Sequence, residues 1–494
     1  MNDQTQKNSS KITPRAENFS QWYLDVIREA DLAENSPVRG SMIIKPYGYA
    51  LWENIQKVLD QEFKKLGTQN AYFPLLIPKS FLEKEAEHVE GFAKECAVVT
   101  HHRLEEKDGK LVPAGELDEP LVIRPTSETI IYDTFSHWIH SYRDLPLLVN
   151  QWCNVMRWEM RPRLFLRTTE FLWQEGHTAH ATKEEADNKT LEMLEIYRKF
   201  VEEYLSISLI KGRKTEIEKF PGADYTSTIE AMMQDGKALQ SGTSHMLGQN
   251  FSKSFGISFL DENQQTQYVW QTSWGLSTRI IGALIMSHSD DRGLVLPPKI
   301  APFHAVIIPI WSNEEEKILV FKEVEKLKNE FEDAKIIYKI DDREGRPGFK
   351  YFEWERKGVP LRVEIGPKDI QKKSVVVVDR LFGNKEFVHN EKRVSFIKES
   401  LENIQKILLE KSKQFRLNNT WEVSDYEEFK RIMAEKPGFI FAHLCLDKKC
   451  EEKIKEETNA NSRCIPFEDG IDNLGKCIYC KKDASNKVLF GKAY

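Results

Sequence analysis

The alternation of apolar and polar residues predicts two helices and a short strand at the start of the chain. Apolar residues recur at helical spacing in QWYLDVIREADL and in LWENIQKVLDQEFKKLG, which ends at Gly67. The apolar segment AYFPLLIP then predicts a short edge strand, because it contains Pro74 and Pro78. A long helix followed by such a strand suits a contact between two copies of the chain, and an unpaired edge explains it equally well.

Residues 154–181 show a different alternation, in which charged and aromatic residues share a face. We interpret NVMRWEMRPRLFLRTTEFLWQEGHTAHA as two antiparallel strands joined by an arginine-rich loop, with Pro162 at the turn. One face of the first strand then carries Arg157 and Glu159, and one face of the second carries Thr169, Phe171, Trp173, Glu175 and His177. An ordinary amphipathic hairpin would be apolar there, because buried charges are costly. We favour a nucleotide site, since guanidinium groups bind phosphate and aromatic rings stack on bases.

The segment RPTSE lies between a predicted strand and a predicted helix and allows two interpretations. Thr126 and Ser127 precede the helix and are suited to cap its first turn. Thr126 and Glu128 could instead hold the cationic amine of a ligand, and the sequence leaves both interpretations open. By contrast, the charged residues 83–117 predict irregular structure, in which His101 and His102 are surface residues and not metal ligands.

Two later segments also place polar residues where a core would be apolar. In LQSGTSHMLG, Gln240, Thr243 and His245 surround an expected glycine turn. In TSWGLSTRIIGALIMSH, a strand ends at Trp274 and Gly275, and Ser277 to Arg279 open an apolar helix. An arginine in the first turn is unfavourable for the helix dipole, but it is well placed to bind a triphosphate.

The pattern changes near residue 300, where strands and helices begin to alternate up to KSVVVVDR, which predicts a small α/β domain. A further domain is expected from residue 409, and it contains four cysteines in two close pairs. Cys445 and Cys450, with Cys477 and Cys480, have the spacing of a structural Zn²⁺ site. Cys464 is a bystander or replaces one ligand.

Length and charge limit the function. A chain of 494 residues with a net charge of −6 suits about three soluble domains and argues against a protein that coats nucleic acid. No signal peptide or apolar span of about 18 residues is recognisable. The paired cysteines favour a reducing compartment, and we expect a cytoplasmic protein.

These segments together resemble the class II aminoacyl-tRNA synthetases. The helix and strand ending near Pro74 are similar to their first signature motif, RWE…FLRTTEFLWQEGH to the second and GLSTRIIGALI to the third. RPTSE, FLWQEGHTAHA, QSGTSH, TSWGLSTR and the cysteine-containing tail most resemble the prolyl enzymes of archaeal and eukaryotic type. The resemblance extends from about residue 18 to the C-terminus and implies ligation of L-proline to tRNA(Pro) through an adenylate, with ATP and Mg²⁺.

The resemblance implies a role for each matching residue at the nucleotide. Arg157 would hold the α-phosphate of ATP and the amino-acid carboxylate, and Arg279 would bind the γ-phosphate. Glu159 would contact the adenine amine and Phe171 would stack on the base. The remaining nucleotide contacts would come from Arg167, Thr168, Gln240, Thr243 and Ser277.

The resemblance also implies the proline and tRNA contacts. Thr126 and Glu128 would bind the imino group, Arg157 the carboxylate, and the pocket would be shaped by Trp173, Glu175, His177 and His245. Glu355, Arg362 and Lys368 would contact the anticodon, although each is as well explained as a solvated surface charge. The family usually has a second arginine where this chain has Thr169, which leaves Arg161 or Arg163 to compensate.

The implied fold is α/β, with the antiparallel sheet and flanking helices of a class II catalytic domain in its α+β form. We expect a flexible arm at 1–18, the catalytic domain at 19–300, a small α/β anticodon-binding domain at 301–408 and an α/β zinc-type domain at 409–494. The chain would form a homodimer without an inserted editing domain and without membrane contact.

Two alternatives and one open question remain. A class II enzyme for threonine, serine or glycine is the nearest alternative, and a threonine enzyme would carry a Cys/His zinc site in its catalytic domain. A synthetase-like RNA-binding or regulatory protein is a second, and the presence of Arg157, Glu159 and Arg279 weighs against it. The terminal segment KVLFGKAY either forms an edge strand of the zinc domain or returns Tyr494 to the catalytic domain.

Overall fold

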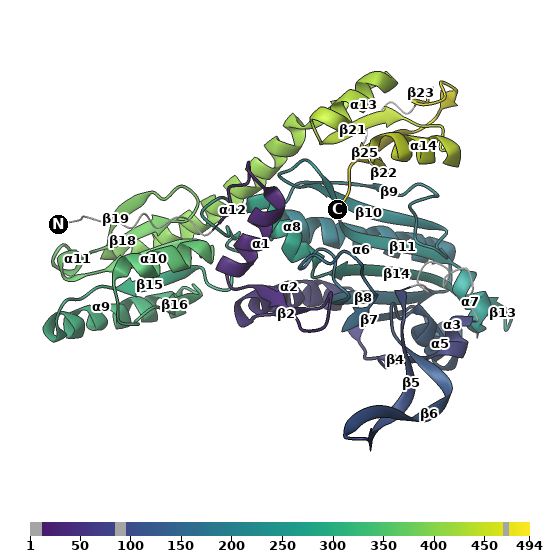
Figure 1. The fold of residues 1–494 in the computed structure, drawn as a ribbon, viewed down its shortest axis with the longest axis horizontal. Coiled ribbons are helices and arrows are strands. Elements are labelled where there is room, and N and C mark those ends of the chain that lie inside the picture. Colours follow the sequence, from purple (N-terminus) through teal and green to yellow (C-terminus); the bar gives the residue numbers. More distant parts are fainter. Residues whose placement is uncertain (1–11, 84–94, 468–473) are drawn as a thin grey trace.

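The computed structural model describes residues 12–83, 95–467 and 474–494 (Figure 1). Its central region is built on a sheet with the strand order β20-β21-β25-β22-β9-β10-β11-β14-β8-β7-β3. The middle of this sheet is antiparallel and consists of Leu147–Met156 (β7), Glu170–His180 (β8), Leu209–Arg213 (β9), Tyr225–Met232 (β10), Ala238–Gly248 (β11) and Trp270–Ser277 (β14). A parallel edge strand is added by Gln69–Asn70 (β3).

Helices cover this sheet and form two apolar cores with it. The larger core combines the sheet with Phe19–Glu29 (α1), Pro46–Lys65 (α2), Lys183–Glu203 (α6) and Arg279–His288 (α8). A second core includes Glu128–Trp138 (α5) and Asn250–Phe255 (α7). The helices predicted before Gly67 and after Ser277 are confirmed. Smaller elements are Ala33–Asn35 (β1), Met42–Ile44 (β2), Lys79–Glu83 (α3), Ser258–Leu260 (β12) and Thr266–Tyr268 (β13).

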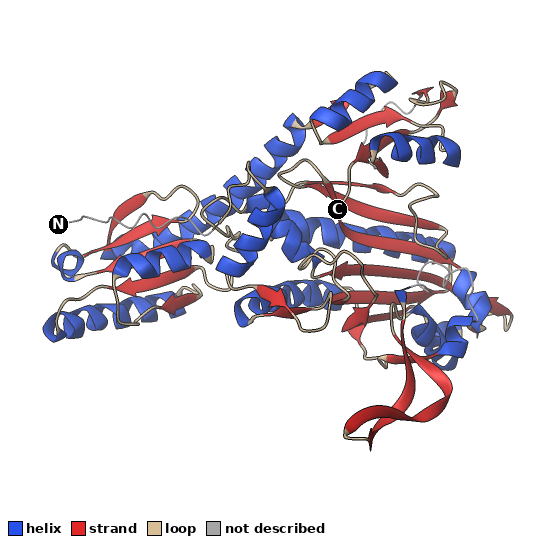
Figure 2. Ribbon diagram, in the orientation of Figure 1, coloured by secondary structure: helices blue, strands red, loops and turns tan. Residues whose placement is uncertain are grey.

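The prediction of irregular structure over 83–117 is wrong for its described part. Ala97–Lys107 (β5) and Lys110–Ile123 (β6) form a long hairpin that projects from the body of the molecule (Figure 2). Most side chains of its outer part are exposed, so no apolar face marks the strands in the sequence. Only the inner end is anchored, through Leu76–Pro78 (β4), which pairs with β6. The segment AYFPLLIP, residues 71–78, begins after β3 ends, and only its last three residues form a strand, β4.

A second region contains a five-stranded mixed sheet in the order β16-β15-β17-β18-β19. Its strands are Ala305–Pro309 (β15), Tyr338–Ile340 (β16), Leu361–Ile365 (β17), Ser374–Asp379 (β18) and Lys385–His389 (β19). Its helices are Glu314–Asp333 (α9), Pro347–Arg356 (α10) and Pro367–Gln371 (α11). The long helix Arg393–Asn418 (α12) then runs from this region to the C-terminal region, so the expected boundary at residue 408 falls inside a helix (Figure 1).

The C-terminal region is joined to the central sheet by strand pairing. It contains Thr420–Glu422 (β20), Tyr426–Glu435 (α13), Phe439–His443 (β21), Lys448–Thr458 (α14), Asn461–Pro466 (β22), Gly475–Lys476 (β23), Asp483–Ala484 (β24) and Lys487–Gly491 (β25). β22 pairs with β9 through Ile465 opposite Arg213, which makes one continuous sheet. β25 lies between β21 and β22, so the last strand is internal and not an edge.

Residues 12–18 of the expected flexible arm pack against the central region. Ile12 is buried in the larger core, Thr13 donates to the carboxylate of Asp25 and Arg15 pairs with Asp291. The rest of that arm lies outside the described residues. In the ranges that the structure describes, no helix combines the length and the apolar character that a membrane span needs.

Candidate active site

Two adjoining cavities bring the candidate residues of the central region together. The larger has a volume of about 340 Å³ and is lined by Thr126, Glu128, Arg157, Phe171, Trp173, Glu175, His177, Gln240, Thr243, His245, Ser277 and Arg279. The smaller, of about 180 Å³, adds Glu159, Arg167 and Thr168. The cavities share Arg157, Phe171, Ser277 and Arg279. Residues that are far apart in the sequence therefore form one continuous site.

Arg157 stands at the junction of the two cavities. β7 ends at Met156, so Arg157 and Glu159 follow the strand and do not lie on its face, which corrects the expected hairpin. The backbone N–H of Arg157 donates to Thr169 O at 2.8 Å, and its Nε donates to Pro125 O at 2.8 Å. Its guanidinium carbon lies 5.6 Å from the ring centres of both Phe171 and Trp173. These contacts fix the fork of the guanidinium before any ligand binds.

Arg279 supplies a second fixed cation, at the first position of α8. Its Nε donates to Leu166 O at 3.1 Å. Burial, together with the nearby guanidinium groups of Arg167 and Arg157, lowers the pKa of Arg279 to about 10. Arg167 is itself paired with Glu159, with Nε and Oε2 3.4 Å apart. Three arginines that repel one another around a cavity are stabilised by a bound polyanion, so this end of the site suits a triphosphate.

The opposite end of the larger cavity is an enclosed polar pocket. Thr126 Oγ1 donates to Glu128 Oε2. The carboxylate of Glu175 accepts from Ser127 Oγ at 2.5 Å and lies 3.1 Å from His177 Nε2. The Ser127 side chain therefore binds Glu175 and does not cap α5, although Ser127 occupies the N-cap position. Of the two interpretations of RPTSE, the structure excludes side-chain capping by Ser127.

Glu175 is held from several sides, mostly by residues that the sequence did not indicate. Gln151 Nε2 donates to it at 2.8 Å, and the Tyr132 hydroxyl lies 3.0 Å from Nδ1 of His177. Glu175 is 3% exposed, and its carboxylate can be buried because these hydrogen bonds replace those to water. Glu175 thus orients His177 and the pocket wall.

His245 lies in the middle of the sheet and not beside a glycine turn, so that prediction is wrong. β11 is a continuous strand that pairs with β10 and β14, and its polar residues face the cavity. Nδ1 of His245 lies 2.9 Å from Thr226 Oγ1, and its ring centre lies 4.7 Å from that of Phe220. The pKa of His245 is lowered to about 4, mainly by burial. Nearby Glu128 raises this pKa and His177 lowers it, each by a smaller amount. The imidazole is therefore neutral at pH 7.

Thr169 does not face the site with Phe171 and Trp173, which corrects the expected face of the second strand. It is fully buried and its N–H donates to Gly40 O at 2.8 Å. Gly40 has φ +84, and a Cβ there would lie 2.2 Å from Thr169 Oγ1. This packing leaves no room at position 169 for a long side chain such as the arginine that the resemblance implied. Arg163 stacks on the rings of Tyr23 and Tyr494 and is not among the residues that line the two cavities, so its expected compensating phosphate contact is not supported.

Other lining residues were missed by the sequence analysis. The larger cavity has one wall formed by Glu218, Lys219, Phe220 and Pro221, from the loop between β9 and β10. The smaller cavity includes Glu95. The Pro–Gly pair in KFPGADYT marked a loop, and a loop between two central strands is a common place for binding residues.

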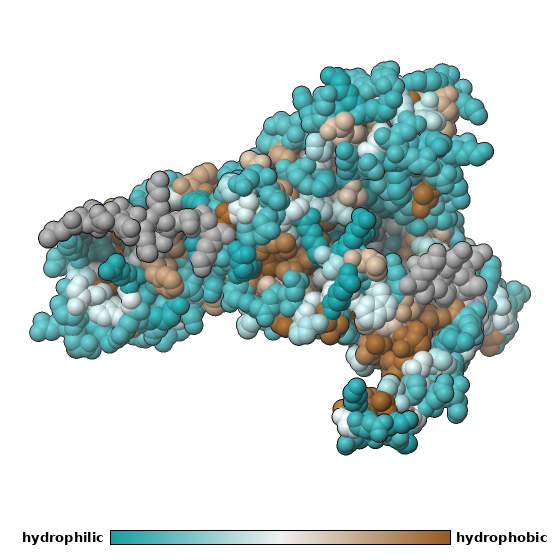
Figure 3. All heavy atoms as spheres, in the orientation of Figure 1, coloured by the Kyte–Doolittle hydropathy of each residue, from teal (hydrophilic) through white to brown (hydrophobic). Residues whose placement is uncertain are grey.

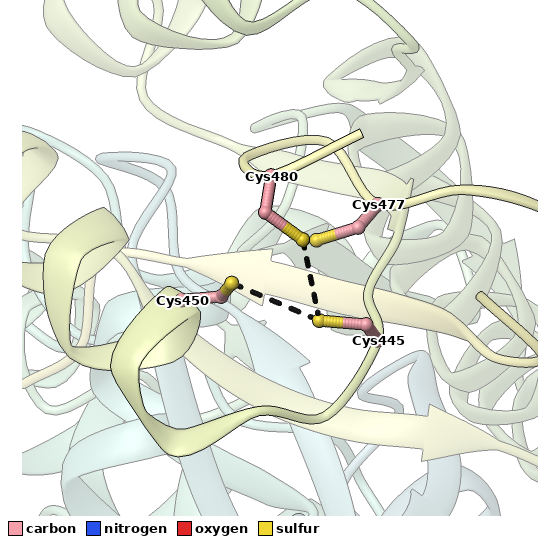
Figure 4. Close-up of side chains that lie close together, drawn as sticks. All are labelled: Cys445, Cys450, Cys477 and Cys480. Atoms are coloured by element: carbon pink, nitrogen blue, oxygen red, sulfur yellow. Dashed lines mark hydrogen bonds between the residues drawn. The ribbon is translucent and has the colours of Figure 1, made fainter. Parts of the chain in front are cut away.

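The four paired cysteines form a cluster that fits a metal (Figure 4). The sulfur atoms of Cys445, Cys450, Cys477 and Cys480 all lie within 4.8 Å of one another. Cys445 Sγ is 3.7 Å from the sulfur atoms of both Cys450 and Cys480. Four thiolates around tetrahedral Zn²⁺ would be about 3.8 Å apart, so this donor set suits zinc. Cys464 is buried in a different apolar cluster, beside Ile210 and Leu489.

The candidate anticodon residues do not all lie together. Glu355 and Arg362 line one cavity of about 340 Å³, which also contains Tyr351, Phe352 and Arg380. Glu355 pairs with Arg292 at 3.0 Å, and Arg362 pairs with Glu364 at 3.0 Å. Lys368 lies on α11, is exposed and does not line this cavity.

Family models agree with this fold and site. Residues 112–288 match the tRNA synthetase class II core domain of the enzymes designated G, H, P, S and T, and residues 304–400 match an anticodon binding domain. The antiparallel sheet and the arginine-lined cavities lie in the first of these matches. The chain is therefore a class II aminoacyl-tRNA synthetase.

Residues 426–494 match the prolyl-tRNA synthetase C-terminal model. The chain is 53% identical to a proline–tRNA ligase of Amoebophilus asiaticus, over 98% of this chain and 99% of that protein. It is 53% identical to one of Bacteroides fragilis and 54% identical to one of Parabacteroides distasonis, in each case over 99% of this chain and the whole of the relative. Within its class, the chain belongs to the prolyl-tRNA synthetase family.

Proposed function

We propose that this enzyme ligates L-proline to tRNA(Pro) in two steps. Proline and ATP form prolyl-adenylate and diphosphate, and the terminal ribose hydroxyl of the tRNA then takes the prolyl group and releases AMP. The observation that supports this most directly is the site itself, where a cluster of fixed arginines adjoins a small, enclosed pocket. The arginine cluster suits a triphosphate, and the enclosed pocket suits a small amino acid.

At the nucleotide end, the roles follow from position and charge. Arg157, at the junction of the cavities, binds the α-phosphate and the proline carboxylate, and Arg279 binds the γ-phosphate. Phe171 stacks on the adenine, Glu159 accepts from its amine, and the further contacts come from Arg167, Thr168, Gln240, Thr243 and Ser277. Mg²⁺ bound with ATP adds neutralising charge to the phosphates.

At the amino-acid end, the paired Thr126 and Glu128 bind the imino group of proline. Trp173 and His177 limit the size of the pocket, Glu175 fixes His177, and neutral His245 closes the side next to Phe220. The proline carboxylate is the nucleophile, so no covalent group from the protein is required. Catalysis then rests on alignment of the reacting groups and on neutralisation of phosphate charge by Arg157 and Arg279.

Pyrophosphate exchange tests this function. ATP–pyrophosphate exchange with the purified full chain should depend on proline and should be much weaker with threonine, serine or glycine. Faster exchange with another amino acid than with proline would show that the enzyme is specific for that amino acid. A chain that shows no exchange with any amino acid would be a synthetase-like protein without adenylation.

For the second region, we propose anticodon binding by Glu355 and Arg362, with Lys368 as an outer phosphate contact. Glu355 and Arg362 are supported by a cavity that also contains aromatic side chains, since unstacked bases bind to aromatic and arginine planes. We propose domains at 19–300, 301–408 and 409–494, each of which contains one of the three family matches, with the last boundary inside α12.

We propose that the chain has the domain composition of the archaeal and eukaryotic type, without an inserted editing domain. The residues between His177 and Arg279 are occupied by α6, by strands of the central sheet and by the short elements that flank them. The relatives named above are bacterial, so the proposal concerns domain composition and not the source organism.

The absence of an editing domain gives a prediction about fidelity. Alanine and cysteine should be activated slowly, because a pocket rejects a smaller competitor only weakly by binding. Alanyl-tRNA(Pro) mixed with the purified chain should then be lost no faster than in buffer. Loss of the alanyl group that scales with enzyme concentration would contradict the prediction.

We propose that the cysteine cluster holds one structural Zn²⁺. The purified chain should contain about one zinc per chain, and Cys480→Ser should lose the metal and lower the Tm, because closed four-thiolate sites contribute to folding. Metal analysis and thermal unfolding measure both. Cys96→Ser is the control, since Cys96 lies outside the cluster, and it should retain its zinc. Full zinc content in Cys480→Ser would contradict the assignment.

We further propose a cytoplasmic homodimer. Figure 3 shows apolar residues gathered where the projecting hairpin meets the body of the molecule, and Tyr72, Leu76 and Val98 are 74%, 38% and 54% exposed. An exposed apolar patch of this kind suits an interface between copies of the chain. Four of the seven cysteines gather in the metal-type cluster, which suits a reducing compartment.

A further inference from the structure

The C-terminal region reaches the wall of the substrate cavity. β22 pairs with β9 at Ile465 and Pro466, next to the point where β9 ends at Arg213. The segment that follows, residues 214–226, supplies one wall of the larger cavity and is called the cavity segment here. Contacts between β22 and this segment can therefore affect the site, although β22 itself does not line it.

A buried ion triad connects β22 to the first residue of the cavity segment. The Glu230 carboxylate is fully buried in β10 and accepts from Lys214 Nζ at 2.8 Å. It also accepts from Arg463 Nε at 3.0 Å and from Arg463 Nη2 at 2.8 Å. Burial alone would raise the pKa of Glu230, but Arg463 and Lys214 lower it below its usual value. Glu230 is therefore ionised between Arg463 and Lys214.

Such a triad is a poor source of stability, because desolvation of the ions offsets most of their attraction. What distinguishes the triad from apolar packing is that its hydrogen bonds are directional. A guanidinium that donates twice to one carboxylate oxygen fixes both groups more closely than apolar packing would. The triad thus fixes β22, β10 and the start of the cavity segment relative to one another.

Two further contacts join the C-terminal region to the same segment. Thr215 Oγ1 donates to Glu451 Oε1 at 2.6 Å, and both residues are buried. Asn461 Nδ2 donates to Glu218 Oε1 at 2.8 Å, and Glu218 lines the cavity. The C-terminal region therefore contacts the segment directly at Thr215 and Glu218, and it reaches Lys214 through Glu230 of β10.

The cavity segment passes this constraint to the amino-acid end of the site. Lys214 N donates to Thr226 O at 2.8 Å, and Phe220 N donates to Thr226 Oγ1 at 2.9 Å. Thr226 Oγ1 in turn lies 2.9 Å from Nδ1 of His245, on which the Phe220 ring packs. These hydrogen bonds and ring contacts lead to the amino-acid end of the site. Arg463 and Glu230 also act on Arg279, at the arginine-lined end, through their charges, which shift its pKa in opposite directions.

We propose that Arg463 is a positioning residue for the small amino-acid substrate. Through Glu230 and Lys214 it holds the cavity segment so that Phe220 and His245 close the pocket. The proposal rests on the proposed function in so far as the amino acid is proline. It assigns to the C-terminal region a role in amino-acid binding that is separate from any metal held there.

Kinetics of the full-length Arg463→Met variant test this role. In ATP–pyrophosphate exchange, KM for proline should rise about tenfold or more, the effect expected for losing hydrogen bonds to a charged group. kcat should change little, because a misplaced wall weakens substrate and transition state alike. KM for ATP should change less than KM for proline, because the charge effects of Arg463 and Glu230 on Arg279 oppose each other and are smaller than the effect of its burial. Arg463→Lys should recover part of the affinity, since it keeps the charge and loses the fork.

Arg393→Met is the matched control. Arg393 is 1% exposed and pairs with Glu323 at 2.8 Å and Glu330 at 2.7 Å, so the variant makes the same chemical change in the second region. Pyrophosphate exchange requires no tRNA, so a change in the second region should not affect it. KM for proline of the Arg393→Met variant should therefore stay at the wild-type value. If Arg463→Met does not fold, Asn461→Ala removes only the contact to Glu218 and should raise KM for proline alone, by a smaller factor.

An unchanged KM for proline in a folded Arg463→Met variant would overturn the proposal. An equal rise in KM for proline and for ATP would also overturn it, because that is the result of general destabilisation. Lack of proline-dependent exchange in the wild-type chain would instead overturn the proposed function, so the two failures are distinguishable.

Discussion

Replacing Arg157 with lysine should lower proline-dependent pyrophosphate exchange about a hundredfold or more, the loss typical of removing one preorganised charge-stabilising group. The guanidinium is fixed by Pro125 O and by the rings of Phe171 and Trp173. Lysine keeps the charge but has a single donor centre, so it cannot bind phosphate and carboxylate together. The measurement is kcat/KM for proline in the exchange reaction, with circular dichroism to show an unchanged fold.

Arg198→Lys is the matched control for this variant. Arg198 forms a helix-surface pair with Glu195 and lies outside both cavities, so its exchange rate should match wild type. Exchange within a few fold of wild type in Arg157→Lys would contradict the assignment of Arg157.

The second strand of the site could be predicted from the sequence because strand alternation is a local property. Phe171, Trp173, Glu175 and His177 are spaced by two residues, and all four line the larger cavity. The alternation no longer predicts which way a side chain faces once the strand has ended. β8 begins at Glu170, so Thr169 leaves the alternation and packs against Gly40 instead.

The parts that could not be predicted depend on contacts between distant segments. The pairing of Ile465 with Arg213 joins two regions into one sheet, and neither residue carries a local signal for it. The Ser127 hydroxyl followed the local rule for a helix cap, but the buried Glu175 carboxylate binds it instead. The prediction of irregular structure in place of the β5–β6 hairpin was wrong for a different reason. A strand pair that is exposed on both faces needs no alternation of apolar residues, so the sequence carries no strand signal there.

Of the two alternatives that the sequence left open for the end of the chain, the edge strand is wrong, and Tyr494 returns to the central region. β25 completes the C-terminal sheet, and the next three residues continue to the central region. Ala238 N donates to Lys492 O at 2.7 Å, and Tyr494 N donates to Ala238 O at 3.2 Å. The Tyr494 hydroxyl donates to Asp235 Oδ2 at 2.5 Å. The ring also lies against Arg163, whose loop leads to Arg167 in the smaller cavity.

Deleting residues 492–494 should therefore reduce proline-dependent exchange roughly ten- to a hundredfold, because small displacements of substrate-binding groups have effects of this size. The deletion releases the start of β11, two residues before Gln240, and removes the ring that packs on Arg163. Zinc content and tRNA affinity should stay at wild-type values, since β25 and the second region are untouched. Tyr494→Phe is the matched control: it loses only the hydrogen bond to Asp235 and should retain most of the activity. Wild-type exchange in the deletion variant would show that the tail packs on the central region without supporting the site.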